Sequence, residues 1–194
     1  MKSLEHFIVE IEKELQDTIK TESGLELYID TQYNEFEHRT TEGTVLAPPA
    51  KYNTGAKAGD TIYFHHHVVI NGGSPLCKED NQYIVNYSHD HAAANQAIAY
   101  KDKDTGKIHP IKGWSLLEPV DEGGEGSDES ELKIVKLEED PVTEGVVSFS
   151  SQELDELGVS NGDVVGFKKN RDYRIKIDGK EYYRVAVTEL LYKV

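Results

Sequence analysis

The pentapeptide Thr41-Glu42-Gly43-Thr44-Val45 recurs in the second half of the chain as Thr143-Glu144-Gly145-Val146-Val147. Each copy precedes a second shared element, Gly59-Asp60-Thr61-Ile62-Tyr63-Phe64 and Gly162-Asp163-Val164-Val165-Gly166-Phe167. A Gly-Asp turn that leads into an apolar run rich in Val and Ile predicts a β-strand after a tight loop. Because the same elements recur in the same order, the sequence predicts two structural units of one design.

Further matches extend the repeat outward. Residues 132–138 alternate apolar and polar side chains as residues 7–12 do, which is typical of a half-buried strand. Leu190-Leu191-Tyr192-Lys193-Val194 is matched with Leu116-Leu117-Glu118-Pro119-Val120, and Asp178-Gly179-Lys180 with the turn at Gly106-Lys107. We therefore expect a first unit over residues 1–120 and a second over residues 132–194. The acidic, glycine-rich residues 121–131 between them are expected to form a flexible linker.

Composition limits the class of protein. Many short Val and Ile runs and eleven Tyr favour an all-β fold. A formal charge of -15 argues against nucleic acid or an anionic membrane as the partner, since like charges repel. The lone Cys77 and the lack of a long apolar run or an export leader lead us to expect a cytoplasmic protein.

One long polar stretch, about residues 17–42, distinguishes the first copy. It contains Gly24, Leu25, Glu26 and Leu27, and Leu25 and Leu27 would share one side of an extended chain. Two interpretations are open: a binding loop, or a strand from Leu25 to Ile29 that packs into a core. The second copy has only five residues, 138–142, between its expected first strand and its Thr-Glu-Gly element, so the fold does not require this stretch. That favours the binding loop.

Two other regions belong to the first unit. Residues 97–110 predict a hairpin around Asp102-Lys103-Asp104-Thr105-Gly106, with Gly106 at a left-handed position. The segment from about residue 70 to residue 99 has no match in the second copy and is expected to be an insertion.

The order of these motifs resembles that of the GroES-type co-chaperonins, the chaperonin-10 family. The resemblance covers most of residues 7–69 and 107–120, and loosely 132–194. It implies two tandem small β-barrels, the first carrying a mobile loop and the second lacking it. It also implies a seven-membered ring of subunits that caps a chaperonin-60-type ring during ATP-dependent protein folding.

The resemblance also implies which residues bind. Gly24 falls on the family's loop glycine, and Leu25, Glu26 and Leu27 fall on its apolar tripeptide. Glu26 departs from the pattern, because that position is ordinarily apolar, so an adapted chaperonin partner has to be considered. Residues 48–58 are also short for the family's roof loop. No nucleophile or phosphate-binding motif occurs, and we expect neither catalysis nor a cofactor.

Histidines supply the alternative function. On a strand, His65 and His67 would share a face, and with His89 or His91 they could offer three nitrogen ligands to zinc. This alternative is a metal- or ligand-binding β-barrel enzyme. No Glu or Cys completes a known ligand spacing, so the sequence favours exposed polar histidines and no structural metal.

Overall fold

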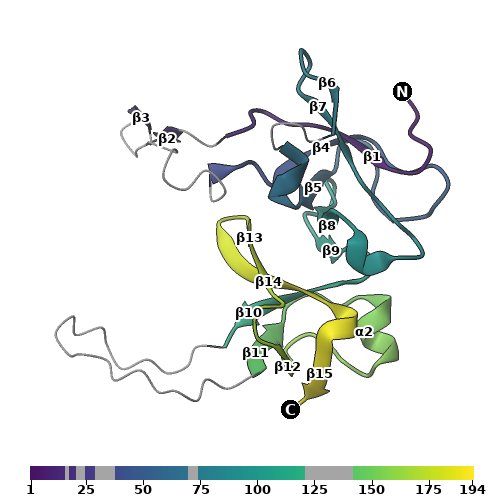
Figure 1. Ribbon diagram of the computed structural model, residues 1–194, viewed down its shortest axis with the longest axis vertical. Helices are drawn as coiled ribbons and strands as arrows, with labels where there is room; N and C mark the ends of the chain where they lie inside the picture. The colour runs from purple at the N-terminus through teal and green to yellow at the C-terminus, as the bar shows by residue number, and fades with distance from the viewer. Residues whose placement is uncertain (16–17, 21–24, 29–37, 70–73, 121–141) are drawn as a thin grey trace. The chain divides into compact units, whose positions relative to one another are not determined.

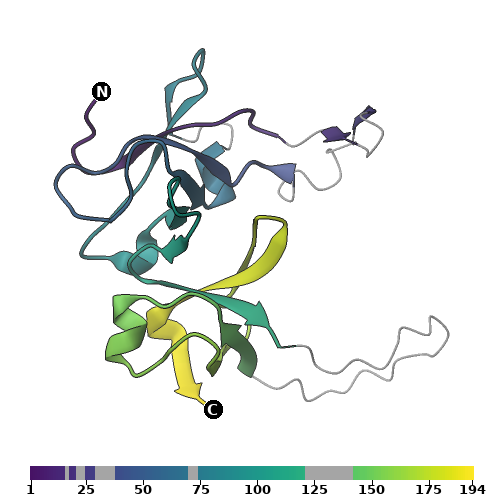
Figure 2. The same cartoon turned by 180° about the vertical axis from the view of Figure 1, so that it is seen from behind.

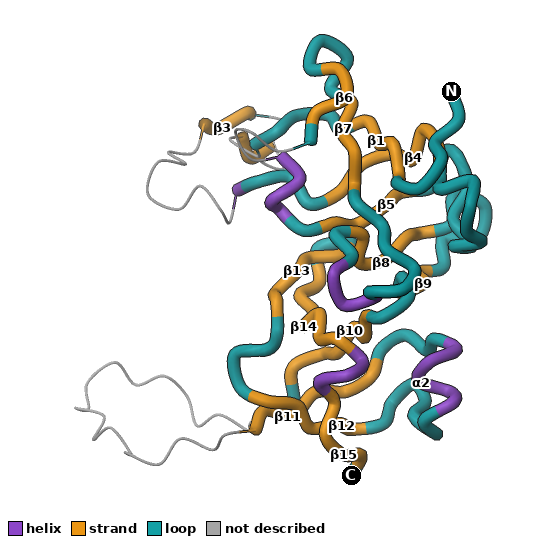
Figure 3. The backbone as a smooth tube through the Cα atoms, turned by 45° about the vertical axis from the view of Figure 1, so that its right-hand side comes forward, coloured by secondary structure: helices purple, strands orange, loops and turns teal. Residues whose placement is uncertain are grey.

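The computed structural model describes residues 1–15, 18–20, 25–28, 38–69, 74–120 and 142–194, with backbone alone for residues 18–20, 26, 27 and 142. These residues form two compact units, Met1–Lys112 and Gly113–Val194. Each unit contains one large antiparallel sheet (Figure 1). Strands and loops make up nearly all of the described chain, as Figure 3 shows by colour. The expected all-β class is confirmed.

The first unit is a seven-stranded sheet in the order β6-β7-β1-β4-β5-β8-β9. Its strands are β1 (Phe7–Glu10), β4 (Glu42–Ala47), β5 (Thr61–Phe64), β6 (Pro75–Cys77), β7 (Gln82–Val85), β8 (Ala97–Lys101) and β9 (Ile108–Pro110). Two short 3₁₀ helices, η2 (His66–Val69) and η3 (Ala92–Ala94), lie in its connections. Apolar residues such as Phe7, Val9 and Ile62 are fully buried in its core.

The second unit is a six-stranded sheet in the order β13-β14-β10-β11-β12-β15. Its strands are β10 (Trp114–Pro119), β11 (Val142–Val147), β12 (Val164–Lys168), β13 (Tyr173–Ile177), β14 (Lys180–Ala186) and β15 (Leu190–Lys193), with the 3₁₀ helix η4 (Val187–Glu189) before β15. The helix α2 (Gln152–Glu156) begins at Ser151, whose side chain accepts a hydrogen bond from Leu154 N. Leu154 packs into the core with Leu117, Val147 and Phe167.

The two sheets have the same topology. If β1, β4, β5, β6, β7 and β8 are matched with β10 to β15 in chain order, the strand neighbours agree throughout, and β9 is the one additional strand of the first sheet. Register agrees as well. Gly43 pairs with Ile62 as Gly145 pairs with Val165. Val9 pairs with Tyr83 as Leu117 pairs with Tyr183.

The Gly-Asp turns before β5 and β12 also make equivalent hydrogen bonds. Gly59 N donates to Val45 O at 2.8 Å, and Gly162 N donates to Val147 O at 2.8 Å. Both glycines have a positive φ, 91° and 88°, which L side chains rarely adopt. The internal repeat that the sequence predicts is therefore a repeat of structure.

The boundary between the units differs from the expected one. β10, expected to close the first unit, lies between β14 and β11 of the second sheet, and it is the counterpart of β1. The expected linker, residues 121–131, lies outside the described residues, but the strands on either side of it belong to one unit. The expected strand at 132–138 is also outside them. The second sheet takes its first strand from before the acidic stretch because Trp114, Leu116 and Leu117 bury their side chains there.

Three expectations about the repeat change accordingly. Asp178-Gly179 joins β13 to β14, so its counterpart is the turn between β6 and β7 and not the one at Gly106-Lys107. The counterpart of Leu190–Lys193 is β8, not residues 116–120, because β15 pairs with β12 as β8 pairs with β5. Residues 70–99 are not an insertion without a counterpart, since β6 and β7 correspond to β13 and β14. The hairpin over residues 97–110 is confirmed by the pairing of β8 with β9. In Figure 2, α2 and the arrowhead of β10 lie on opposite sides of the second unit.

The strand expected after the Gly59-Asp60 turn ends before His65 and His67. β5 ends at Phe64, and the chain turns into η2, whose Val68 and Val69 are buried.

Among the described residues, no helix is both long and apolar enough to cross a membrane.

Candidate functional site

The stretch expected to bind a partner leaves the first sheet after β1 and returns before β4. Two pieces of it are described as short strands, β2 (Thr18–Lys20) and β3 (Glu26–Tyr28). They pair antiparallel, Ile19 opposite Leu27, and form a two-stranded sheet of their own. The second interpretation from the sequence was a strand from Leu25 to Ile29 that packs into a core. Residues 26–28 do form a strand, but that strand belongs to neither large sheet.

Two side chains in or next to this hairpin are open to solvent. Leu25 is 60% exposed and Tyr28 is 82% exposed. Gly24 lies outside the described residues, and Glu26 and Leu27 are described by their backbone. Exposure of a leucine and a tyrosine so close together is what a binding segment without its partner would show.

The base of the stretch is fixed to the first unit. Leu15 and Arg39 form an isolated antiparallel bridge. Next to it, Thr40 N donates to Glu14 O at 3.0 Å, and the Thr40 hydroxyl donates to Lys13 O. Arg39 is buried, and its Nη1 donates to Val69 O at 2.8 Å. The two ends of the stretch are therefore held together by backbone and side-chain hydrogen bonds.

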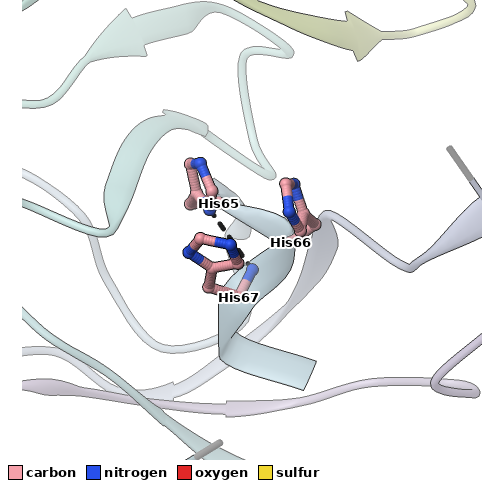
Figure 4. A group of neighbouring side chains, drawn as sticks. All are labelled: His65, His66 and His67. Carbon is pink, nitrogen blue, oxygen red and sulfur yellow. Dashed lines mark hydrogen bonds between the residues drawn. The ribbon is translucent and has the colours of Figure 1, made fainter. Parts of the chain in front are cut away.

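A second candidate lies where β5 ends. His65, His66 and His67 each offer a nitrogen, and these nitrogens all lie within 4.8 Å of one another (Figure 4). The ring centroids are 4.3 to 4.4 Å apart. His67 N donates to His65 Nδ1 at 3.2 Å. His67 is exposed, and the other two are half-buried.

Burial, together with the nearby His67 and Arg39, lowers the pKa of His66 to about 4. A neutral imidazole is the form that binds metals. At neutral pH, His66 is therefore in a form able to act as a ligand.

The sequence suggested His65 and His67, together with His89 or His91, as metal ligands, and the structure brings a different group of histidines together. His65 and His67 do come together, but through η2 and not on one face of a strand. Among the described residues the close group leaves out His89 and His91. His89 instead stacks on Tyr52, with ring centroids 4.9 Å apart.

Sequence reasoning missed His66 as a member of this group. On a strand, its side chain would point away from those of His65 and His67. The signal that could have found it is the run of three histidines itself, which can close into a cluster wherever the strand stops.

Comparison with protein-family models and with curated protein sequences finds no match for this chain.

Proposed function

We propose that this protein is a non-catalytic co-chaperonin that caps a chaperonin-60-type ring and assists ATP-dependent folding. In this proposal each of the two units is a small GroES-like β-barrel. The stretch containing Gly24, Leu25, Glu26 and Leu27 contacts the ring, and several chains, seven by the resemblance, assemble so that these stretches act together.

The observation that carries the proposal is the position of Leu25. It is exposed, beside a hairpin that pairs with neither large sheet, on a stretch whose two ends meet at the Leu15–Arg39 bridge. A segment of this kind presents apolar side chains without exposing the core of the unit that carries it.

Energetics explain why a ring would be needed. Burying two leucine side chains gives roughly 3 to 6 kcal/mol before the cost of ordering the segment. About 4 kcal/mol corresponds to a millimolar dissociation constant. Several copies on one assembly raise the avidity by roughly 10² to 10⁴, because later contacts become intramolecular. Weak single contacts also allow release.

The test is binding of the purified chain to a double-ring chaperonin-60 with and without ATP, measured by co-sedimentation. We expect nucleotide-dependent binding, and we expect the double variant Leu25→Ser, Leu27→Ser to lose it while its unfolding midpoint stays close to that of the wild type. Leu157→Ser is the matched control, because Leu157 is 62% exposed at the end of α2, outside the proposed contact.

Two results would contradict the proposal. One is binding by the double variant at wild-type strength. The other is a fall in the unfolding midpoint alongside the loss of binding, which would place the leucines in a core.

Sedimentation equilibrium tests the assembly separately: a seven-membered ring has seven times the 21.8 kDa mass of the chain.

A further inference from the structure

We propose that His65, His66 and His67 form a binding site for a divalent transition-metal ion of the zinc class. The site is separate from the proposed chaperonin contact and does not depend on it. It uses His65, the residue before η2, together with His66 and His67, the first two residues of η2 (Figure 4).

The ligand chemistry favours this class of ion. Three imidazole nitrogens suit zinc, copper and nickel, whereas calcium and magnesium require oxygen ligands. In a tetrahedral zinc site, ligand nitrogens about 2.0 to 2.1 Å from the metal lie roughly 3.3 Å from each other. The three nitrogens lie within 4.8 Å of one another, so the gap that side-chain rotation has to close is small. A fourth position stays open for water because His67 is exposed.

The backbone that carries the histidines is held on both sides. His65 N donates to Gln96 O at 3.0 Å, and Val68 N donates to His65 O at 3.0 Å. Val68 and Val69 anchor the turn by burial, and Arg39 Nη1 binds Val69 O. A fixed turn lowers the entropy that the ligands lose on binding, which favours a preformed site.

Two local features oppose binding and limit its strength. His65 Nδ1 accepts the His67 N–H, so a metal at this nitrogen competes with that hydrogen bond, although water can replace it at the surface. Arg39 is close enough to His66 to affect it electrostatically, and its positive charge repels a dication. No carboxylate belongs to the close group among the described residues. We therefore expect micromolar affinity, and not the tighter binding of a structural zinc site.

The experiment uses the full-length, untagged chain stripped with EDTA. Isothermal titration with Zn²⁺ measures stoichiometry and affinity, and titration with Co²⁺ reports nitrogen ligands through visible absorption bands. We expect equimolar uptake by the wild type and a rise of the unfolding temperature with zinc. The double variant His65→Ala, His67→Ala and the single variant His66→Ala should each bind roughly tenfold more weakly or worse.

His91→Ala is the matched control, because His91 is an exposed histidine outside the close group. It should bind as the wild type does. Absence of saturable uptake by the wild type would overturn the proposal, as would unchanged affinity in the double variant or an equal loss in the control. If the double variant does not fold, His67→Ala alone must weaken binding, since its exposed ring contributes little to packing.

Discussion

Asp60 and Asp163 occupy the same position in two turns of one design. Asp60 Oδ2 accepts the Lys57 N–H at 2.7 Å, and Asp163 Oδ2 accepts the Ser160 N–H at 2.6 Å. Their surroundings differ. Asp60 is 1% exposed, and its second oxygen accepts a hydrogen bond from Lys103 N. Asp163 instead forms an ion pair with Lys193 near the surface.

That difference predicts unequal costs of substitution. Asp60→Ala leaves two backbone N–H groups, in part-buried hydrogen bonds, without their acceptor, and we expect it to lower the free energy of unfolding by about 1 to 3 kcal/mol. Asp163→Ala should cost less, since water can reach its partners. Chemical denaturation of both variants checks this, and a larger loss for Asp163→Ala would contradict it.

Unit boundaries can be tested with shortened chains. Residues 113–194 contain every strand of the second sheet, whereas residues 132–194 lack β10, which lies between β14 and β11. We expect the longer piece to unfold cooperatively on heating and the shorter piece to show no cooperative transition. Cooperative unfolding of residues 132–194 would restore the boundary expected from the sequence.

Close strand packing explains why both copies have glycine after the shared Thr-Glu pair. A Cβ at Gly145 would lie 2.8 Å from Leu117 Cβ, and one at Gly43 would lie 2.8 Å from Glu10 O. Because strand backbone cannot move away freely, Gly43→Ala and Gly145→Ala should each destabilise by about 1 to 3 kcal/mol. Thr44→Ala, at an exposed neighbouring position, should change stability little. The midpoints of chemical denaturation measure these changes in stability. Equal effects of Gly43→Ala and Thr44→Ala would contradict the packing argument.

Glu118 provides a test by pH. Lys180 Nζ, 2.6 Å from Glu118 Oε2, and the Ser148 hydroxyl lower the pKa of this carboxyl below 4.5. Its folded pKa is depressed, so its stabilisation is present above pH 4.5 and is lost as pH falls through the folded value. Lys180→Met should raise the Glu118 pKa in an NMR titration and destabilise at pH 7, with the difference shrinking in acid. Lys176→Met serves as control, and an unchanged Glu118 titration in Lys180→Met would contradict this ion pair.

The departure at Glu26 makes a prediction for the proposed chaperonin contact. If Leu25 and Leu27 dock on the ring, Glu26→Ala should keep or strengthen binding, because the Glu26 side chain either faces away from the groove or loses water at its edge. Competition against the wild-type chain for a chaperonin-60 ring measures the difference. A large loss of binding in Glu26→Ala would show that its carboxylate makes a required contact.

Local sequence determined much of this protein. The all-β class, the repeated Gly-Asp turns and the hairpin of β8 and β9 follow from glycine positions and apolar alternation, which act over a few residues. Those signals are short-range, and the structure keeps them: Gly59 and Gly162 have the positive φ that their turns require.

Tertiary structure decided which strand belongs to which sheet and which histidines meet. Antiparallel pairing joins residues far apart in sequence, so the place of Trp114–Pro119 beside β14 and β11 could not be read from its own alternation. His66 joined His65 and His67 because β5 stops at Phe64: consecutive side chains point to opposite faces on a strand, but turn by about 120° in a 3₁₀ helix. Burial of Val68 and Val69 selects that turn, and burial is a property of the whole unit.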